Sequence, residues 1–292
     1  MIGAHAYFSG SGGIRLHYRC WDVPQPRAVV IICHGLGEHS GRYEELARDL
    51  ARAGLSSFAL DHRGHGRSDG RRGHVRRFTR YVHDLEKFRR RVVGAVGDEL
   101  PLVFLGHSLG GLILLRYLQE YPGVTSCGAV FSAPLLGIAT EIPRWKERLA
   151  TVLGYSVPAL PLSSGLNPEY LSHDLQVVAA YRRDPLVHDR ITPRLFSEIK
   201  AEVDRAFHDV GRLTLPVLFL IPSADRLVRP DLMQQFASLL GRGPRVEVRT
   251  LPGLYHEVLN ESTRSSVVAD LLGWIERRIA GYMPAPGGGA SR

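Results

Sequence analysis

The chain has 292 residues, 44% of them hydrophobic and 23% charged, which predicts one large folded domain, with or without an insertion. Its three cysteines contain no CxxC pair, which argues against a disulfide framework or a cysteine-based zinc site and favours a reducing, cytoplasmic compartment. The first residues lack the basic start and apolar core of a signal peptide, and no apolar run approaches the ~18 residues of a membrane-spanning helix.

The formal charge is +8 with histidine neutral, and nearly all of the positive charge is arginine. The densest basic stretch runs from Arg71 to Arg80. Because it contains no nucleic-acid-binding motif, we expect no nucleic-acid partner. We interpret it as a solvated loop, and weak attraction to an anionic membrane surface is the alternative.

Short apolar runs bounded by turn residues predict eight strands, at residues 4–8, 14–20, 28–33, 56–60, 102–105, 128–132, 216–221 and 246–251. Helical periodicity predicts helices at 43–53, 82–96, 112–118, 230–240 and 263–280. Alternating strands and helices indicate an α/β fold with a mostly parallel eight-stranded sheet covered by helices on both faces.

The alternation is interrupted between Pro134 and about Leu213, where prolines are scattered and no run predicts a strand. We interpret 134–213 as a helical cap inserted after the sixth strand, and 1–133 with 214–282 as the α/β core. An insertion there follows the carboxyl end of a strand, where the sites of α/β proteins lie. The tail, 283–292, is rich in proline and glycine and is expected to be disordered.

The sequence GHSLGG at 106–111 follows a predicted buried strand and precedes a predicted buried helix. A Gly-x-Ser-x-Gly pattern in that context predicts a nucleophile elbow, with Ser108 on a strained turn between strand and helix. Gly106 and Gly110 are the structural glycines, because a Cβ at either position would collide where the strand and helix cross.

A serine hydroxyl needs a base, and the base needs an orienting acid, each expected just after a strand in the order serine, acid, histidine. Asp225 and His256 meet these requirements. Two rival acids fit less well: Asp231 falls inside a predicted helix, and Glu257 is too close to His256 to reach its ring.

The other histidines receive different interpretations. His107 adjoins the nucleophile, but we expect the turn to direct its side chain elsewhere. His34 and His65 are expected to shape loops, and the three histidines of the cap are expected at the surface or in loops: His173, His188 and His208.

Acyl transfer also needs N–H donors for an oxyanion. We expect them to be Leu109, directly after the nucleophile, and Leu36, in the glycine-flanked loop after the third strand. No histidine or acidic residues have metal-ligand spacing, so we expect no metal and no cofactor.

Several motifs together resemble the monoacylglycerol lipase and lysophospholipase family of the α/β-hydrolases. They are HGLGEHSGRY at 34–43, DHRGHGRS at 61–68, GHSLGG at 106–111, SADRLV at 223–228 and YHE at 255–257, with FSAPL at 131–135 and RDPL at 183–186 extending the likeness into the cap. The resemblance implies a cofactor-free serine hydrolase of lipid esters with a helical lid, using Ser108, Asp225 and His256 as its triad and the N–H groups of Leu36 and Leu109 as its oxyanion donors.

Substrate choice should depend on the cap. There Trp145, Leu149, Val152 and Leu153 share one predicted helical face, which could rest on a lipid surface or pack on its own domain. The expected substrate is a monoacylglycerol. The alternatives are a lysophospholipase, a general short- or medium-chain carboxylesterase, a peptidase of the proline-iminopeptidase type and a catalytically silent binding module.

Overall fold

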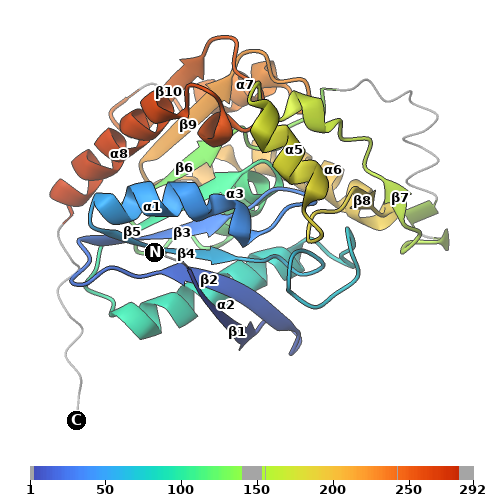
Figure 1. Ribbon diagram of the computed structural model, residues 1–292, viewed down its shortest axis with the longest axis horizontal. Coiled ribbons are helices and arrows are strands. Elements are labelled where there is room, and N and C mark those ends of the chain that lie inside the picture. Colours follow the sequence, from blue (N-terminus) through green and yellow to red (C-terminus); the bar gives the residue numbers. More distant parts are fainter. Residues whose placement is uncertain (1–2, 140–152, 155, 242, 283–292) are drawn as a thin grey trace.

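The computed structural model describes residues 3–139, 153–154, 156–241 and 243–282 (Figure 1). Eight strands form one sheet in the order β1-β2-β4-β3-β5-β6-β9-β10. The strands are β1 (Ala4–Ser9), β2 (Arg15–Trp21), β3 (Ala28–Cys33), β4 (Leu55–Leu60), β5 (Leu102–His107), β6 (Gly128–Ser132), β9 (Val217–Pro222) and β10 (Val246–Leu251). Strand β1 pairs antiparallel with β2, and β2 with β4, whereas all later pairs are parallel, as the sequence predicts.

Helices cover both faces of this sheet (Figure 1). On one face lie α1 (Glu44–Arg52), which follows the 3-10 turn η1 (Ser40–Tyr43), and α8 (Arg264–Ala280). On the other lie α2 (Thr79–Val96), α3 (Leu109–Glu120) and α7 (Pro230–Leu239). Helix α3 begins three residues before the predicted start, because the glycines at 110 and 111 carry no apolar periodicity.

Strand β3 shows how the sheet separates two hydrophobic cores. Its residues are all buried, with Val29 and Ile31 facing the core on the α3 side and Val30 and Ile32 facing the core on the α1 side. Because both faces are covered, the strand reads as a continuous apolar run without polar alternation.

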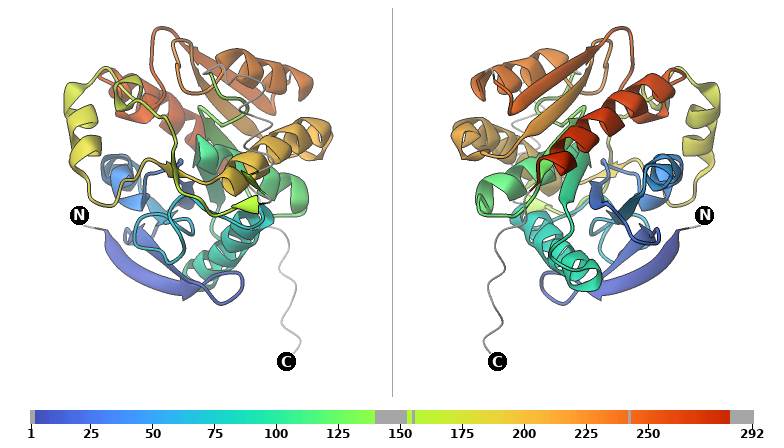
Figure 2. Two further views of the ribbon diagram at one scale, coloured as in Figure 1. Left: turned by 90° about the vertical axis from the view of Figure 1, so that its right-hand side faces the viewer. Right: turned by 90° about the vertical axis from the view of Figure 1, so that its left-hand side faces the viewer.

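The segment between β6 and β9 lies over the carboxyl end of the parallel strands (Figures 1 and 2). It contains η2 (Pro168–Tyr170), α5 (Leu175–Arg183), α6 (Pro193–His208) and η3 (Val210–Arg212). It also contains two antiparallel strands, β7 (Leu162–Ser163) and β8 (Arg190–Ile191), where the sequence predicts none. Two-residue strands are too short to leave a periodic pattern.

Two sequence predictions lie outside the described residues. One is the apolar helical face of Trp145, Leu149, Val152 and Leu153, of which only Leu153 is described. The other is the tail after Tyr282, which the sequence predicts to be disordered. Within the described ranges, no helix is both long enough and apolar enough to cross a membrane.

A buried charge network joins α6 to α3. The Arg116 Nε donates to Glu202 Oε2 at 2.8 Å, and its Nη1 donates to Asp209 Oδ2 at 2.9 Å. Gln119 extends the network by accepting from Arg116 and donating to the carbonyl of Ala206. The helix after the elbow therefore anchors the last helix of the cap segment.

This network predicts unequal effects for two arginines that bind the same carboxylate. Arg116 is 11% exposed and Arg205 is 61% exposed, and both pair with Glu202. Arg116→Ala leaves Glu202 buried with little compensation and should lower the free energy of unfolding by about 3–5 kcal/mol. Arg205→Ala should lower it by no more than about 1 kcal/mol. Urea unfolding measures both, and equal losses would contradict the assignment.

Candidate active site

The turn at Ser108 joins β5 to α3 in a conformation that few non-glycine residues adopt. Its φ is 51° and its ψ is −119°. The Ser108 N–H donates to the carbonyl of Ser132 at 3.1 Å, and the Ser108 carbonyl accepts from the N–H groups of Leu112 at 3.1 Å and Leu135 at 2.9 Å. These bonds hold the strained turn from both sides.

The two predicted structural glycines lie where the strand and helix nearly touch. A Cβ on Gly106 would lie 2.8 Å from both the carbonyl oxygen of Gly110 and the Cα of Gly111. A Cβ on Gly110 would overlap the carbonyl oxygens of Cys33 and His34. The start of α3 therefore packs directly against the end of β3, an approach that only glycine permits.

Asp225 and His256 come together after β9 and β10. The His256 Nδ1 lies 2.7 Å from Asp225 Oδ2, and both side chains are buried. The other oxygen, Oδ1, accepts the N–H groups of Leu227 at 2.8 Å and Val228 at 3.0 Å. The carboxylate is thus fixed in orientation by three donors.

These contacts shift the pKa values of both groups. Burial alone would lower the pKa of His256, but the charge of Asp225 and the hydrogen bond to it raise the pKa above its ordinary value. Burial would raise the pKa of Asp225, but His256 and the two N–H donors lower it. Asp225 therefore stays ionised and favours a proton on the imidazole.

Ser108 and His256 line one cavity of about 430 Å³ beneath the cap segment. Most of the cavity wall is apolar, and it includes Leu135 and Ile138 after β6, Leu162 and Leu166 of the cap segment, and Phe196 and Ile199 of α6. This volume is typical of a small-molecule site.

The predicted oxyanion donors lie beside the serine. Leu109 is the first residue of α3, so its N–H has no partner within the helix. Leu36 lines the cavity, and within the described chain no acceptor takes its N–H. A Cβ on Gly35 would lie 3.2 Å from the Cβ of Ser108, which shows how closely this loop approaches the nucleophile.

The expectation for His107 was wrong. Its side chain lines the cavity, and its ring centroid lies 4.7 Å from that of His256. The Nδ1 of His107 lies 3.1 Å from the carbonyl oxygen of Ser132, which places the ring next to β6. Burial and the neighbouring His256 lower the pKa of His107 to about 4, so it is neutral at pH 7.

A buried ion network beside the cavity was missed at the sequence level. Arg42 donates to Glu38 at 3.0 Å and makes a two-pronged contact with Glu257. Glu38 also accepts the N–H of Gly35 at 2.5 Å and the hydroxyl of Tyr43 at 3.0 Å. Arg42 therefore joins the loop of Leu36 to the loop of His256; the four-residue spacing of Glu38 and Arg42 was the available signal.

Burial would raise the pKa of Glu38, but Arg42 and the nearby histidines lower it to about 2. Glu38 therefore remains an anion throughout the neutral range. This charge keeps the Gly35 N–H bound and so fixes the backbone that presents Leu36.

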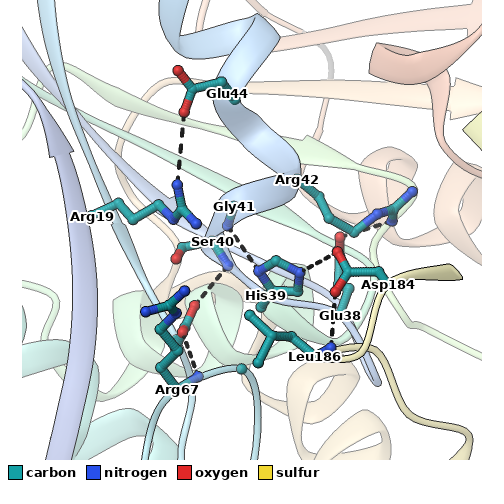
Figure 3. Close-up of polar contacts among 12 residues, drawn as sticks. Arg19, Glu38, His39, Ser40, Gly41, Arg42, Glu44, Arg67, Asp184 and Leu186 are labelled. Carbon is teal, nitrogen blue, oxygen red and sulfur yellow. Dashed lines mark hydrogen bonds and ion pairs between the residues drawn. The ribbon is translucent and has the colours of Figure 1, made fainter. Parts of the chain in front are cut away.

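His39 connects the same loop to the cap segment (Figure 3). Its Nε2 lies 2.9 Å from Asp184 Oδ2, while its Nδ1 accepts the N–H of Gly41 at 3.1 Å. The other Asp184 oxygen accepts the N–H of Leu186 at 2.8 Å. This imidazole–carboxylate contact is thus one of those that join the cap segment to the loop of Leu36.

Backbone bonds also connect the cap segment to the loop that carries His256. The His256 N–H points to the carbonyl of Tyr170 at 3.4 Å, and the Glu257 N–H donates to the carbonyl of Leu171 at 2.8 Å. On the side chain of His173, Nδ1 lies 2.9 Å from Glu261 Oε1. These contacts, together with those of Ser172 to Asn260 and Glu261, hold η2 and its continuation against this loop.

The remaining histidines mostly follow the predictions. His34 shapes a loop by accepting the N–H of His62 at 2.9 Å, and the Nδ1 of His65 lies 3.1 Å from the Arg63 carbonyl oxygen. His208 is exposed. His188 lies in a loop but is half-buried, since its Nε2 lies 3.2 Å from the carbonyl oxygen of Gly64 in the core.

Comparisons with known proteins show the family to which this chain belongs. A family profile described as serine aminopeptidase, S33, matches residues 24–263. A monoacylglycerol lipase of Mycolicibacterium smegmatis is 38% identical over 92% of this chain and 95% of its own length. The chain belongs to the monoacylglycerol lipase family of the α/β-hydrolases.

Further relatives agree with this placement. Rat monoglyceride lipase is 33% identical over 92% of this chain and 89% of its own length. The crystal structure of a monoacylglycerol lipase from Paleococcus ferrophilus has a TM-score of 0.80 at 33% identity, covering 90% of this chain and 99% of that one. The family membership and the α/β-hydrolase fold expected from the motifs are confirmed, and the roles of the individual site residues stay predictions.

The pKa of His256 tests the pairing with Asp225. In Asp225→Asn the strongest raising influences are gone, so burial should lower the pKa of His256 even though Glu257 and Glu38 still raise it. Asp231→Asn is the matched control, because Asp231 is exposed and pairs with Arg229. Titration of the His256 ring protons by NMR measures the pKa in each variant; an unchanged value in Asp225→Asn would refute the pairing.

Proposed function

We propose that this protein cleaves monoacylglycerols into a fatty acid and glycerol by serine hydrolysis. The observation that carries the proposal is the joint position of three features: a strained serine turn, a buried histidine–aspartate pair and an apolar cavity onto which Ser108 and His256 both open. The names of the relatives support the substrate class.

In the proposed mechanism His256 takes the proton of the Ser108 hydroxyl as the serine oxygen attacks the ester carbonyl. The Nε2 of His256 is the acting atom, because Nδ1 is engaged by Asp225. Asp225 holds the ring and stabilises the imidazolium. The imidazolium then gives its proton to the glycerol oxygen as the carbon–oxygen bond breaks, leaving an acyl group on Ser108.

The N–H groups of Leu36 and Leu109 stabilise the oxyanion of the tetrahedral intermediate. Each donor of this kind contributes ~10²–10³ in rate. Water, deprotonated by His256, then attacks the acyl-enzyme, and the fatty acid leaves as Ser108 recovers its proton. At the end of the cycle the serine hydroxyl and the neutral imidazole are both restored.

The cavity favours an ester over a peptide with a free amino terminus. Of the described residues that line it, the carboxylates Glu38 and Glu257 are both paired with Arg42. A free amine would need an unpaired anion, so an aminopeptidase activity is disfavoured despite the description of the family profile. A lysophospholipase or a short-chain carboxylesterase would use the same catalytic groups and remains the alternative.

A peripheral membrane location fits a lipid substrate. The exposed large apolar side chains of the cap segment include three that lie close together in the chain, Val157 at 43%, Leu160 at 43% and Leu162 at 41%. Leu162 also lines the cavity, so the apolar surface continues into the site. We propose that this surface touches the bilayer transiently during substrate uptake.

Fluorophosphonate labelling tests the nucleophile. Ser108→Ala should abolish labelling and ester hydrolysis, because no other residue is proposed to attack the carbonyl. Ser132→Ala is the control, since Ser132 lies near the turn but contributes its carbonyl to Ser108. Labelling that persists in Ser108→Ala would overturn the assignment.

A chain-length series separates the lipase from a general carboxylesterase. Each methylene placed in the apolar cavity should contribute about 0.8 kcal/mol, or roughly fourfold in kcat/KM, until the cavity is full. We therefore expect kcat/KM to rise along a series of glycerol monoesters from short to long acyl chains. A preference for short soluble aryl esters would instead assign a general carboxylesterase.

A further inference from the structure

A second pocket, of about 470 Å³, lies between the core loop that precedes α2 and the cap segment around β8. The core contributes Arg71 and Arg72, which belong to the basic stretch noted in the sequence. The cap segment contributes Pro161, Pro185, Leu186, Val187, His188 and Arg190. Three arginines thus line one hollow at the junction of the two parts.

Backbone contacts hold the walls of this pocket together. The Thr192 N–H donates to the carbonyl of Gly73 at 2.9 Å, and the His188 N–H donates to the carbonyl of Gly37 at 2.9 Å. Gly73 has a φ of +61°, and a Cβ there would overlap the carbonyl of Arg190. The arginines therefore project from a framework that is already assembled.

The positive charge in the pocket is poorly neutralised. Within the described ranges, no carboxylate pairs with Arg71 or Arg72, and Arg190 pairs only loosely with the exposed Asp189, at 3.8 Å. Arg72 donates through Nη2 to the carbonyl of Gly66 at 2.6 Å, whereas its Nη1 is buried without an acceptor. A buried charged donor without a partner is costly, and an anion bound close by in the pocket would offset its charge.

His188 adds no charge to this set at neutral pH. Burial and the nearby Arg72 lower its pKa to about 4. Its Nδ1 accepts the N–H of Arg190 at 3.2 Å, which fixes the start of β8. Asp184, which precedes the pocket residue Pro185 in the chain, is bound to His39 and to the Leu186 N–H.

We propose that this pocket binds the phosphate of an anionic phospholipid headgroup at the membrane surface. Guanidinium groups match phosphate oxygens in a two-pronged geometry, and three arginines line this pocket. The apolar neighbours point to a lipid rather than a free anion, because Pro161 of the pocket lies between the exposed Leu160 and Leu162. Leu162 in turn lines the active-site cavity, so a seated headgroup places the cavity against the bilayer.

The proposal does not depend on the ester hydrolysis and is tested by vesicle sedimentation. Arg71→Gln/Arg72→Gln removes two pocket charges, each contributing about fivefold in membrane affinity near an anionic surface. We expect the full-length variant to lose at least about tenfold in partitioning onto phosphatidylcholine vesicles that contain phosphatidylglycerol. Binding to pure phosphatidylcholine should change little.

Arg76→Gln/Arg77→Gln is the matched control, because these neighbouring arginines are exposed and do not line the pocket. It removes the same charge and should lose no more than about threefold. Equal losses in both variants would mean diffuse attraction and would overturn the proposal. Hydrolysis of a soluble short-chain ester should be unchanged in both, which separates loss of membrane binding from misfolding or failure of the active site.

Two further experiments test which chemical group the pocket binds. Arg71→Lys/Arg72→Lys keeps the charge but loses the planar fork, so partial loss of binding supports phosphate recognition by guanidinium groups. Inorganic phosphate should compete with the vesicles for the pocket. If phosphate binds, as measured by a shift in Tm, but anionic vesicles do not, the occupant is a free anion and the lipid assignment is wrong.

Discussion

The close packing of Gly110 against the end of β3 is the constraint on which the rest of the site depends. At this point the first turn of α3 and the carbonyl groups of Cys33 and His34 leave no room for a side chain. The loop of Leu36 starts at the same place, so the nucleophile, the helix N-terminus and the second N–H donor share one origin. Their relative positions follow from backbone packing rather than from any side chain.

The position of His256 depends instead on ion pairs beside it. His256 lies on a loop after an edge strand, where hydrophobic burial gives less support than it gives Ser108. Glu257, the next residue, is bound by Arg42, which also binds Glu38 under the oxyanion loop. Because all three side chains are largely buried, removal of one would leave the others uncompensated. The two loops are therefore coupled.

The sequence predicted the features that local pattern encodes. Buried strands, the glycines of the elbow and the order of Ser108, Asp225 and His256 each leave a signal within a few residues. The contact between Arg42 and Glu257 leaves none, because these two residues are 215 positions apart in the chain, and only the spacing of Glu38 and Arg42 is local. The position of His107 depends on a contact with β6, and the arginine-lined second pocket depends on the meeting of two loops; a linear pattern records neither.

The carbonyl groups of Tyr170 and Leu171 accept hydrogen bonds from the loop of His256, so this part of the cap segment differs from the part that only lines the cavity. The apolar side chains of Leu162 and Leu166 line the cavity in which we propose that the acyl chain binds, so they can change without disturbing the loop of His256. The path of the chain at 170–171 cannot change, whatever its side chains, because its carbonyl groups support the loop that carries His256. Substrate range can therefore diverge by substitution in the first part, whereas a transplanted cap must preserve the course of the second.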